Sequence, residues 1–201
     1  MCLIFISLST ELVKARRYAV DVTLDSDTAH PELVLSENRK QVRNGDTKQD
    51  LPDNPERFNW CPCVLGNEGV SSGRRYWEVQ VGDKTDWVLG VARESISRKG
   101  KIKLSPNNGY WTIWLRDRKE YKALADSYVS INLSVKPQKV GVYVDYEEGQ
   151  VSFYSVEDKS HIYTFTGYKF TEKLFPFLCS GFSYCSENSA PLIISLVSDT
   201  D

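Results

Sequence analysis

Cysteine and histidine are the side chains of this sequence that could hold a metal ion. The chain has two histidines and five cysteines, which are Cys2, Cys61, Cys63, Cys179 and Cys185. Structural zinc sites take four ligands, commonly from pairs separated by two to four residues. Neither close pair of cysteines has this spacing, so we expect no metal and no other cofactor. An odd number of irregularly spaced cysteines also differs from the disulfide framework of a secreted domain, and favours free thiols in a reducing cytoplasm.

A second motif with possible chemistry is Gly69-Val70-Ser71-Ser72-Gly73, which has the G-x-S-x-G pattern of serine hydrolases. That chemistry needs the serine on a tight turn between a strand and a helix, beside a histidine that an acid orients. Here the pentapeptide leads directly into an expected strand, and neither His30 nor His161 has an evident orienting acid. We therefore interpret the motif as a turn and expect no catalysis by this chain.

The local basic cluster is Arg98-Lys99-Gly100-Lys101, with Arg93 and Lys103 nearby. Such a cluster is either a solvated loop or a phosphate-binding patch, and both readings stay open. The whole chain has 25 basic and 27 acidic residues, a formal charge of −2, so it has no general attraction to nucleic acid or anionic membranes. The apolar run at residues 2–8 is far shorter than the roughly 20 residues that span a bilayer.

The elements that position these residues are predicted to be short strands. Residues 76–81 place Trp77, Val79 and Val81 on one face of a strand and Glu78 on the other. A hairpin with Gly149 in its turn is expected between two later strands. Together with 76–81, the expected strands are Leu33–Ser36, Trp87–Ala92, Tyr110–Leu115, Val140–Tyr146, Gln150–Tyr154, His161–Phe165, Leu174–Leu178 and Leu192–Leu196. The pattern predicts an all-β fold, an antiparallel β-sandwich.

Helical structure is expected only in short segments. Residues 1–20 form a lead-in, in which residues 11–17 could make about two helical turns with Leu12 and Ala15 on one face. This helix could be the stub of a longer one. Residues 54–58 could form a single helical turn with Pro55 at its first position. We expect residues 21–197 to fold as one unit without the lead-in.

Several segments, in order, resemble a known family. Residues 22–36 resemble the PRY segment, although Ser26 stands where the family usually has proline. Residues 65–79, 87–92, 109–111 and 144–154 resemble the SPRY segment. The resemblance covers residues 20–197 and implies a concanavalin-like jelly roll, with PRY at about 21–66 and SPRY at about 67–197.

The resemblance implies a protein-recognition module of the tripartite-motif (TRIM) ubiquitin ligase type, acting in innate immunity. In those ligases this domain binds the target protein, and a RING domain elsewhere transfers ubiquitin. The cysteines and histidines here are too few for the two zinc sites of a RING. Any ligase activity, and any oligomer, would depend on segments outside this chain. The alternatives are a butyrophilin-type sensor of a small phosphorylated ligand near Arg98, and a non-binding scaffold domain.

The resemblance also implies a partner-binding site. The pocket of antibody-binding TRIM relatives aligns with Val88, Trp114, Arg116 and Phe182. Val88 replaces an acid and Arg116 replaces a second tryptophan, which argues against an antibody as the partner.

The strand pattern adds an expectation for the tryptophans of this site. Trp111 and Trp114 lie three apart on one strand and so face opposite sides of the sheet. We expect Trp114, Arg116 and Phe182 to meet on one exposed concave patch, with loops 44–62 and 117–128 as its rim. The other possibility is that Trp114 and Phe182 serve packing alone.

Overall fold

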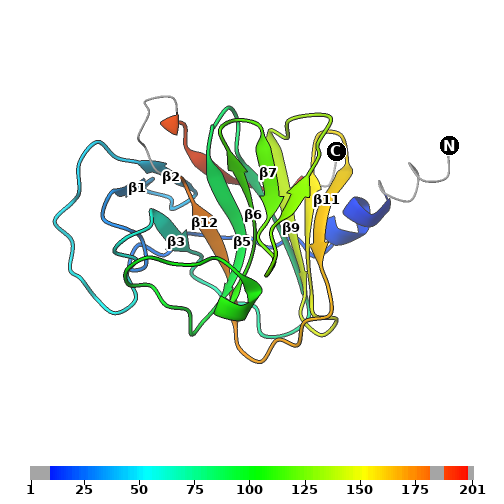
Figure 1. The fold of residues 1–201 in the computed structure, drawn as a ribbon, viewed down its shortest axis with the longest axis horizontal. Helices are drawn as coiled ribbons and strands as arrows, with labels where there is room; N and C mark the ends of the chain where they lie inside the picture. The colour runs from blue at the N-terminus through cyan, green and yellow to red at the C-terminus, as the bar shows by residue number, and fades with distance from the viewer. Residues whose placement is uncertain (1–9, 182–187, 199–201) are drawn as a thin grey trace.

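Two antiparallel sheets pack face to face in the computed structural model, which describes residues 10–181 and 188–198 (Figure 1). The seven-stranded sheet has the order β1 (Leu33–Leu35), β2 (Gln41–Asn44), β13 (Leu192–Ser195), β4 (Arg74–Gln80), β9 (Lys139–Asp145), β10 (Gln150–Ser155) and β11 (Ser160–Phe165). The six-stranded sheet has the order β3 (Cys63–Leu65), β12 (Leu174–Cys179), β5 (Trp87–Arg93), β6 (Tyr110–Arg116), β7 (Glu120–Ala123) and β8 (Val129–Ile131). The predicted β-sandwich is confirmed.

The main core lies between the two sheets. Trp77 and Val79 of β4 meet Leu89 and Val91 of β5 there, and all four side chains are buried. Every second residue of a strand points to the same face, so the alternation in the sequence places these apolar side chains inward together. The strands that the sequence predicts all form, each within one or two residues of its expected bounds.

Strands from the first third of the chain pair with strands from its end. β2 pairs with β13, with Val42 opposite Leu192. β3 pairs with β12, with Cys63 opposite Cys179. Each sheet therefore contains strands from both halves of the resemblance, and the residues near 21–66 are part of the same sandwich as those after them.

Four of the strands have no counterpart among the strands that the sequence predicts. They are β2, β3, β7 and β8, and each has only three or four residues. Runs this short show too little alternation to be recognised in one sequence, and their pairing depends on partners far along the chain.

The expected helical turn at residues 54–58 is a hydrogen-bonded turn instead. The backbone N–H of Arg57 donates to the carbonyl oxygen of Asn54 at 3.2 Å, and the Asn54 side chain accepts the N–H of Glu56 at 2.9 Å. An asparagine side chain that bonds its own backbone favours turns over helix. The described 3-10 helix is Pro106–Asn108 (η1). In the described part of the chain, no helix is long and apolar enough to cross a membrane.

The lead-in forms a helix, described from residue 10 to residue 16, at the opposite end of the molecule from the loop that joins β2 and β3 (Figure 1). Leu12 and Ala15 are buried against Tyr76 and Tyr154, on the outer face of the seven-stranded sheet. This contact places apolar helical residues over sheet positions that would otherwise face water.

The same helix explains the burial of Glu78, which alternation places on the outer face of β4. Its side chain is 0% exposed, ion-paired with Arg16 at 3.0 Å and accepting a hydrogen bond from the Tyr76 hydroxyl at 2.8 Å. A buried carboxylate needs such partners, because burial without them costs several kcal/mol.

Candidate functional site

The outer face of the six-stranded sheet brings the expected partner-binding residues together. Val88 of β5 and Trp114 of β6 are direct cross-strand partners, and Arg116 lies two residues further along β6 on the same face. Trp111 points the other way, into the core between the sheets. Trp114 belongs to a separate apolar cluster with Val88, beneath the loops that cover this outer face. The expectation that the two tryptophans face opposite sides is confirmed.

Trp114 itself is largely buried, with 8% of its surface exposed. The Arg116 guanidinium lies 3.7 Å from the centre of the Trp114 ring, and the Tyr128 ring packs edge-on against it at 5.4 Å. The expectation of an exposed Trp114 ring is therefore wrong, because these two side chains cover it. Arg116 and Tyr128, which are exposed, form the accessible surface above it.

Two adjoining pockets open on this face, and Arg116 lines both. The larger has a volume of about 720 Å3, and its lining includes Trp60, Cys61, Val88 and Arg118. The smaller has a volume of about 400 Å3, and its lining includes Trp114 and Tyr128. Both lie within the size range of ligand pockets in proteins.

Both expected rim loops contribute to the two pockets. Trp60 belongs to loop 44–62 and is 56% exposed, and Tyr128 ends loop 117–128 and is 44% exposed. Large exposed aromatic side chains beside an apolar hollow are typical of protein-binding surfaces.

The smaller pocket is basic. Lys101, Lys103 and Arg116 line it, and no acidic residue of the described chain does so. The larger pocket is mixed, because Asp86 and Asp117 stand beside its basic groups. From the sequence, Lys101 and Lys103 are recognised only as members of the basic cluster around Arg98. The loop that follows β5 brings both lysines into the same pocket as Arg116.

Phe182, the fourth expected site residue, lies outside the described residues. Gly181 and Asn188, the described residues that come just before and just after residues 182–187, both line the larger pocket. The candidate partner-binding site therefore consists of Val88, Trp114 and Arg116, together with Tyr128, which the structure adds.

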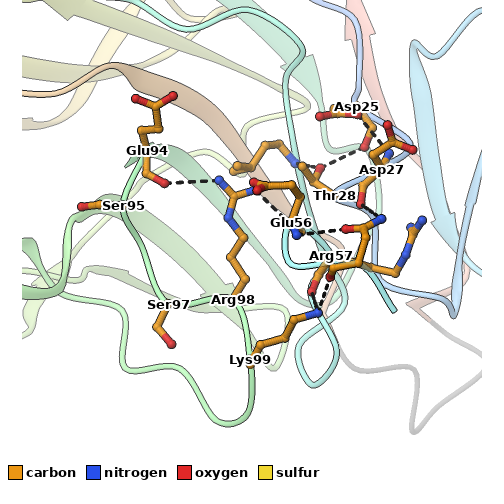
Figure 2. Close-up of polar contacts among 12 residues, drawn as sticks. Asp25, Asp27, Thr28, Glu56, Arg57, Glu94, Ser95, Ser97, Arg98 and Lys99 are labelled. Carbon is orange, nitrogen blue, oxygen red and sulfur yellow. Dashed lines mark hydrogen bonds and ion pairs between the residues drawn. The ribbon is translucent and has the colours of Figure 1, made fainter. Parts of the chain in front are cut away.

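The basic cluster around Arg98 serves the fold (Figure 2). Arg98 is 9% exposed, is ion-paired with Glu56 at 3.2 Å and donates to the carbonyl oxygen of Glu94 at 3.3 Å. Lys99 donates to the carbonyl oxygens of Asn54 and Arg57, each at 2.7 Å. Both cations hold the turn at residues 53–57 against the loop after β5. These contacts argue against the alternative reading of a phosphate-binding patch centred on Arg98.

Family models match most of the chain. The model of the SPRY-associated domain, PRY, matches residues 22–70, and that of the SPRY domain matches residues 74–192. The chain belongs to the PRY-SPRY family. Neither model is that of a catalytic domain.

Relatives of this PRY-SPRY chain include several named proteins. It is 55% identical to nuclear factor 7, brain, of Xenopus laevis over 84% of this chain and 28% of that protein. It is 48% identical to the E3 ubiquitin-protein ligase TRIM68 of Homo sapiens over 92% of this chain and 39% of that protein. Human pyrin is 46% identical over 92% of this chain and 24% of pyrin. The chain thus spans about a quarter to two fifths of the length of these relatives.

Solved structures share the PRY-SPRY fold. The crystal structure of the TRIM65 PSpry domain matches with a TM-score of 0.76 and 20% identity, over 98% of this chain and 97% of that one. The stonustoxin structure matches with a TM-score of 0.78 and 28% identity, over 89% of this chain and 29% of that one.

The other chemical motifs of the PRY-SPRY chain are structural where the structure describes them. Residues 69–73 run into β4 rather than a helix, which removes the geometry of a nucleophilic serine. His30 is buried, accepts the N–H of Glu32 at 3.1 Å, and has its pKa lowered by that burial. His161 lies on β11 and contacts the Thr164 hydroxyl at 2.6 Å. Within residues 10–181 and 188–198, no group of three His, Cys, Asp or Glu side chains could hold a metal ion.

Proposed function

We propose that this chain is the target-recognition module of a longer, cytoplasmic TRIM-type ubiquitin ligase in innate immunity. The partner is a protein, and the binding surface is the outer face of the six-stranded sheet around Val88, Trp114, Arg116 and Tyr128. The proposal of a ubiquitin ligase is supported by a relative, 48% identical over 92% of the chain, which is an E3 ubiquitin-protein ligase. Ubiquitin transfer would belong to another part of the longer protein.

The observation that carries the proposed surface is the Arg116–Trp114 stack. A guanidinium 3.7 Å from an indole is held in place by that contact, while its N–H donors remain free to bond a partner carboxylate or carbonyl. Among the described residues no acid is ion-paired with Arg116. Arginine and aromatic residues that surround an apolar hollow are the types most enriched among binding hot spots.

The test is capture from cell lysate by immobilised protein, compared across charge-matched variants. Arg116→Glu is expected to lose the specific partner, because a hot-spot loss of about 2 kcal/mol lowers affinity about 30-fold. Arg75→Glu is the control, because Arg75 is exposed on β4 in the other sheet. Proteins retained by the wild type and by Arg75→Glu, but not by Arg116→Glu, would be partners of this surface. Equal retention by all three would refute the proposed surface.

A further inference from the structure

Three cysteine thiols lie together at the wall of the larger pocket. Cys63 and Cys179 are cross-strand partners on β3 and β12, and their side chains share the outer face of the sheet. Cys61 lies two residues before Cys63 in the chain, and its carbonyl oxygen accepts the N–H of Cys63 at 2.7 Å. The thiols of Cys61 and Cys179 lie close enough to Cys63 to affect its pKa. All three line the pocket, Cys61 being half-buried and the other two buried.

The surroundings make these thiols chemically unequal. The neighbouring Cys63 thiol and the backbone N–H of Ile102 lower the pKa of Cys61 to about 7. Burial, followed by the contacts with Cys179 and Cys61, raises the pKa of Cys63 well above its usual range. Cys63 therefore keeps its proton. Cys61 is the thiol that becomes a thiolate, which is the nucleophilic form.

The pocket that Cys61 faces can also attract an anion. Its charged lining residues are Asp86, Lys101, Arg116, Asp117 and Arg118. Tyr110 belongs to the same apolar cluster as Cys63 and Cys179. Lys101 and Arg116 have no ion-pair partner in the described parts of the chain, so their charge remains available to a ligand. A volume of about 720 Å3 is large enough for a peptide-sized molecule.

We propose that Cys61 is a modification site that forms a mixed disulfide with a small anionic disulfide, of which oxidised glutathione is the common example. The Cys61 thiolate attacks one sulfur of that disulfide. A new S–S bond forms, the original S–S bond breaks, and the other half leaves as a thiolate, so no further oxidant is needed. Lys101 and Arg116 bind the carboxylates of the reagent. This modification does not depend on the proposed protein partner.

The first test measures where and how fast two disulfides react. The protein carries Cys2→Ser and Cys185→Ser, so the three described cysteines are the remaining thiols. It is mixed with oxidised glutathione or, at the same concentration, with the neutral bis(2-hydroxyethyl) disulfide, and the adduct is followed by intact mass and peptide mapping. We expect one glutathionyl group per chain, on Cys61, and none in Cys61→Ser. Mapping of the adduct to Cys63 or Cys179 would overturn the assignment.

The second test separates the anion site from the thiolate. Lys101→Glu with Arg116→Glu should slow the reaction of oxidised glutathione but not that of the neutral disulfide, while Arg75→Glu changes neither. Cys63→Ala should slow the neutral reaction about threefold, because losing the neighbouring thiol raises the pKa of Cys61, which lowers the thiolate fraction while raising the intrinsic reactivity of that thiolate. Circular dichroism establishes that each variant is folded. Equal rates for the two reagents in all proteins, or an unchanged rate in Cys63→Ala, would contradict the proposal.

Discussion

At the scale of single residues, burial decides what a side chain can contribute to binding. Trp114 has the right position in the sheet for a partner contact, but Arg116 and Tyr128 cover its ring. A largely buried indole stabilises the fold and holds the side chains above it in place. The direct contacts with a partner then fall to Arg116 and Tyr128, whose loss should affect binding more than stability.

Truncation of Trp114 should therefore destabilise the protein. Trp114→Ala is expected to lower the free energy of unfolding by about 3–5 kcal/mol, because it leaves a cavity in the apolar cluster on the outer face of the six-stranded sheet. Arg116→Ala should cost less than about 1 kcal/mol, since its side chain is exposed. Urea unfolding followed by circular dichroism measures both. A Trp114→Ala protein as stable as the wild type would mean that the ring is not packed as described.

At the scale of elements, the N-terminal helix completes one face of the seven-stranded sheet. Leu12 and Ala15 cover Tyr76, and Arg16 neutralises the buried Glu78. The boundary at residue 21 stays a prediction, but these contacts extend the stabilising structure to the helix before it. The helix takes no part in strand pairing, and the bridge between Ala19 and Tyr76 is made by the segment that follows it.

Removal of residues 1–18 should leave a folded but weakened sandwich. We expect the free energy of unfolding to fall by about 4 kcal/mol, because Tyr76 and Tyr154 lose their apolar cover and Glu78 loses its ion-pair partner. Circular dichroism should still show the β-sheet spectrum at room temperature. In the full chain, Arg16→Met should reproduce part of the loss, whereas Arg17→Met, at an exposed position, should not. An unchanged stability after truncation would show that the helix contributes nothing.

At the scale of the whole molecule, the sandwich is tied together by pairings between distant segments. β2 joins β13 and β3 joins β12, so the two ends of the chain meet in both sheets. Buried tyrosines lie on the outer faces of both sheets, with Tyr76 on β4 and Tyr110 on β6. Burial raises the pKa of each, and for Tyr76 the neighbouring Glu78 raises it further.

These tyrosines predict a loss of stability in alkaline solution. In the unfolded chain tyrosine ionises near pH 10. The folded protein holds these protons to higher pH, so it binds more protons than the unfolded chain above pH 10, and its stability falls there. The expected slope is up to about 1.4 kcal/mol per pH unit for each tyrosine. Unfolding curves between pH 8 and pH 11 measure it, and Tyr110→Phe should make the slope shallower. The same slope in that variant would contradict the assigned role of Tyr110.

The sequence by itself determined the fold class, the order of the longer strands, the hairpin at Gly149 and the family. Alternation along a strand depends only on local geometry, and Gly149, at a φ of 64°, occupies a turn conformation that glycine adopts most easily. The family resemblance in the sequence also aligned Val88, Trp114 and Arg116 with the partner-binding pocket of relatives, and the structure places these three residues side by side. Only the tertiary structure decided what covers each face. Alternation tells which side a residue points to. It does not predict the pairing of Glu78 with Arg16, of Arg98 with Glu56 or of Cys63 with Cys179, because these contacts join segments far apart in the chain. Nor does it predict the covering of Trp114, which depends on how the nearby Arg116 and Tyr128 side chains pack.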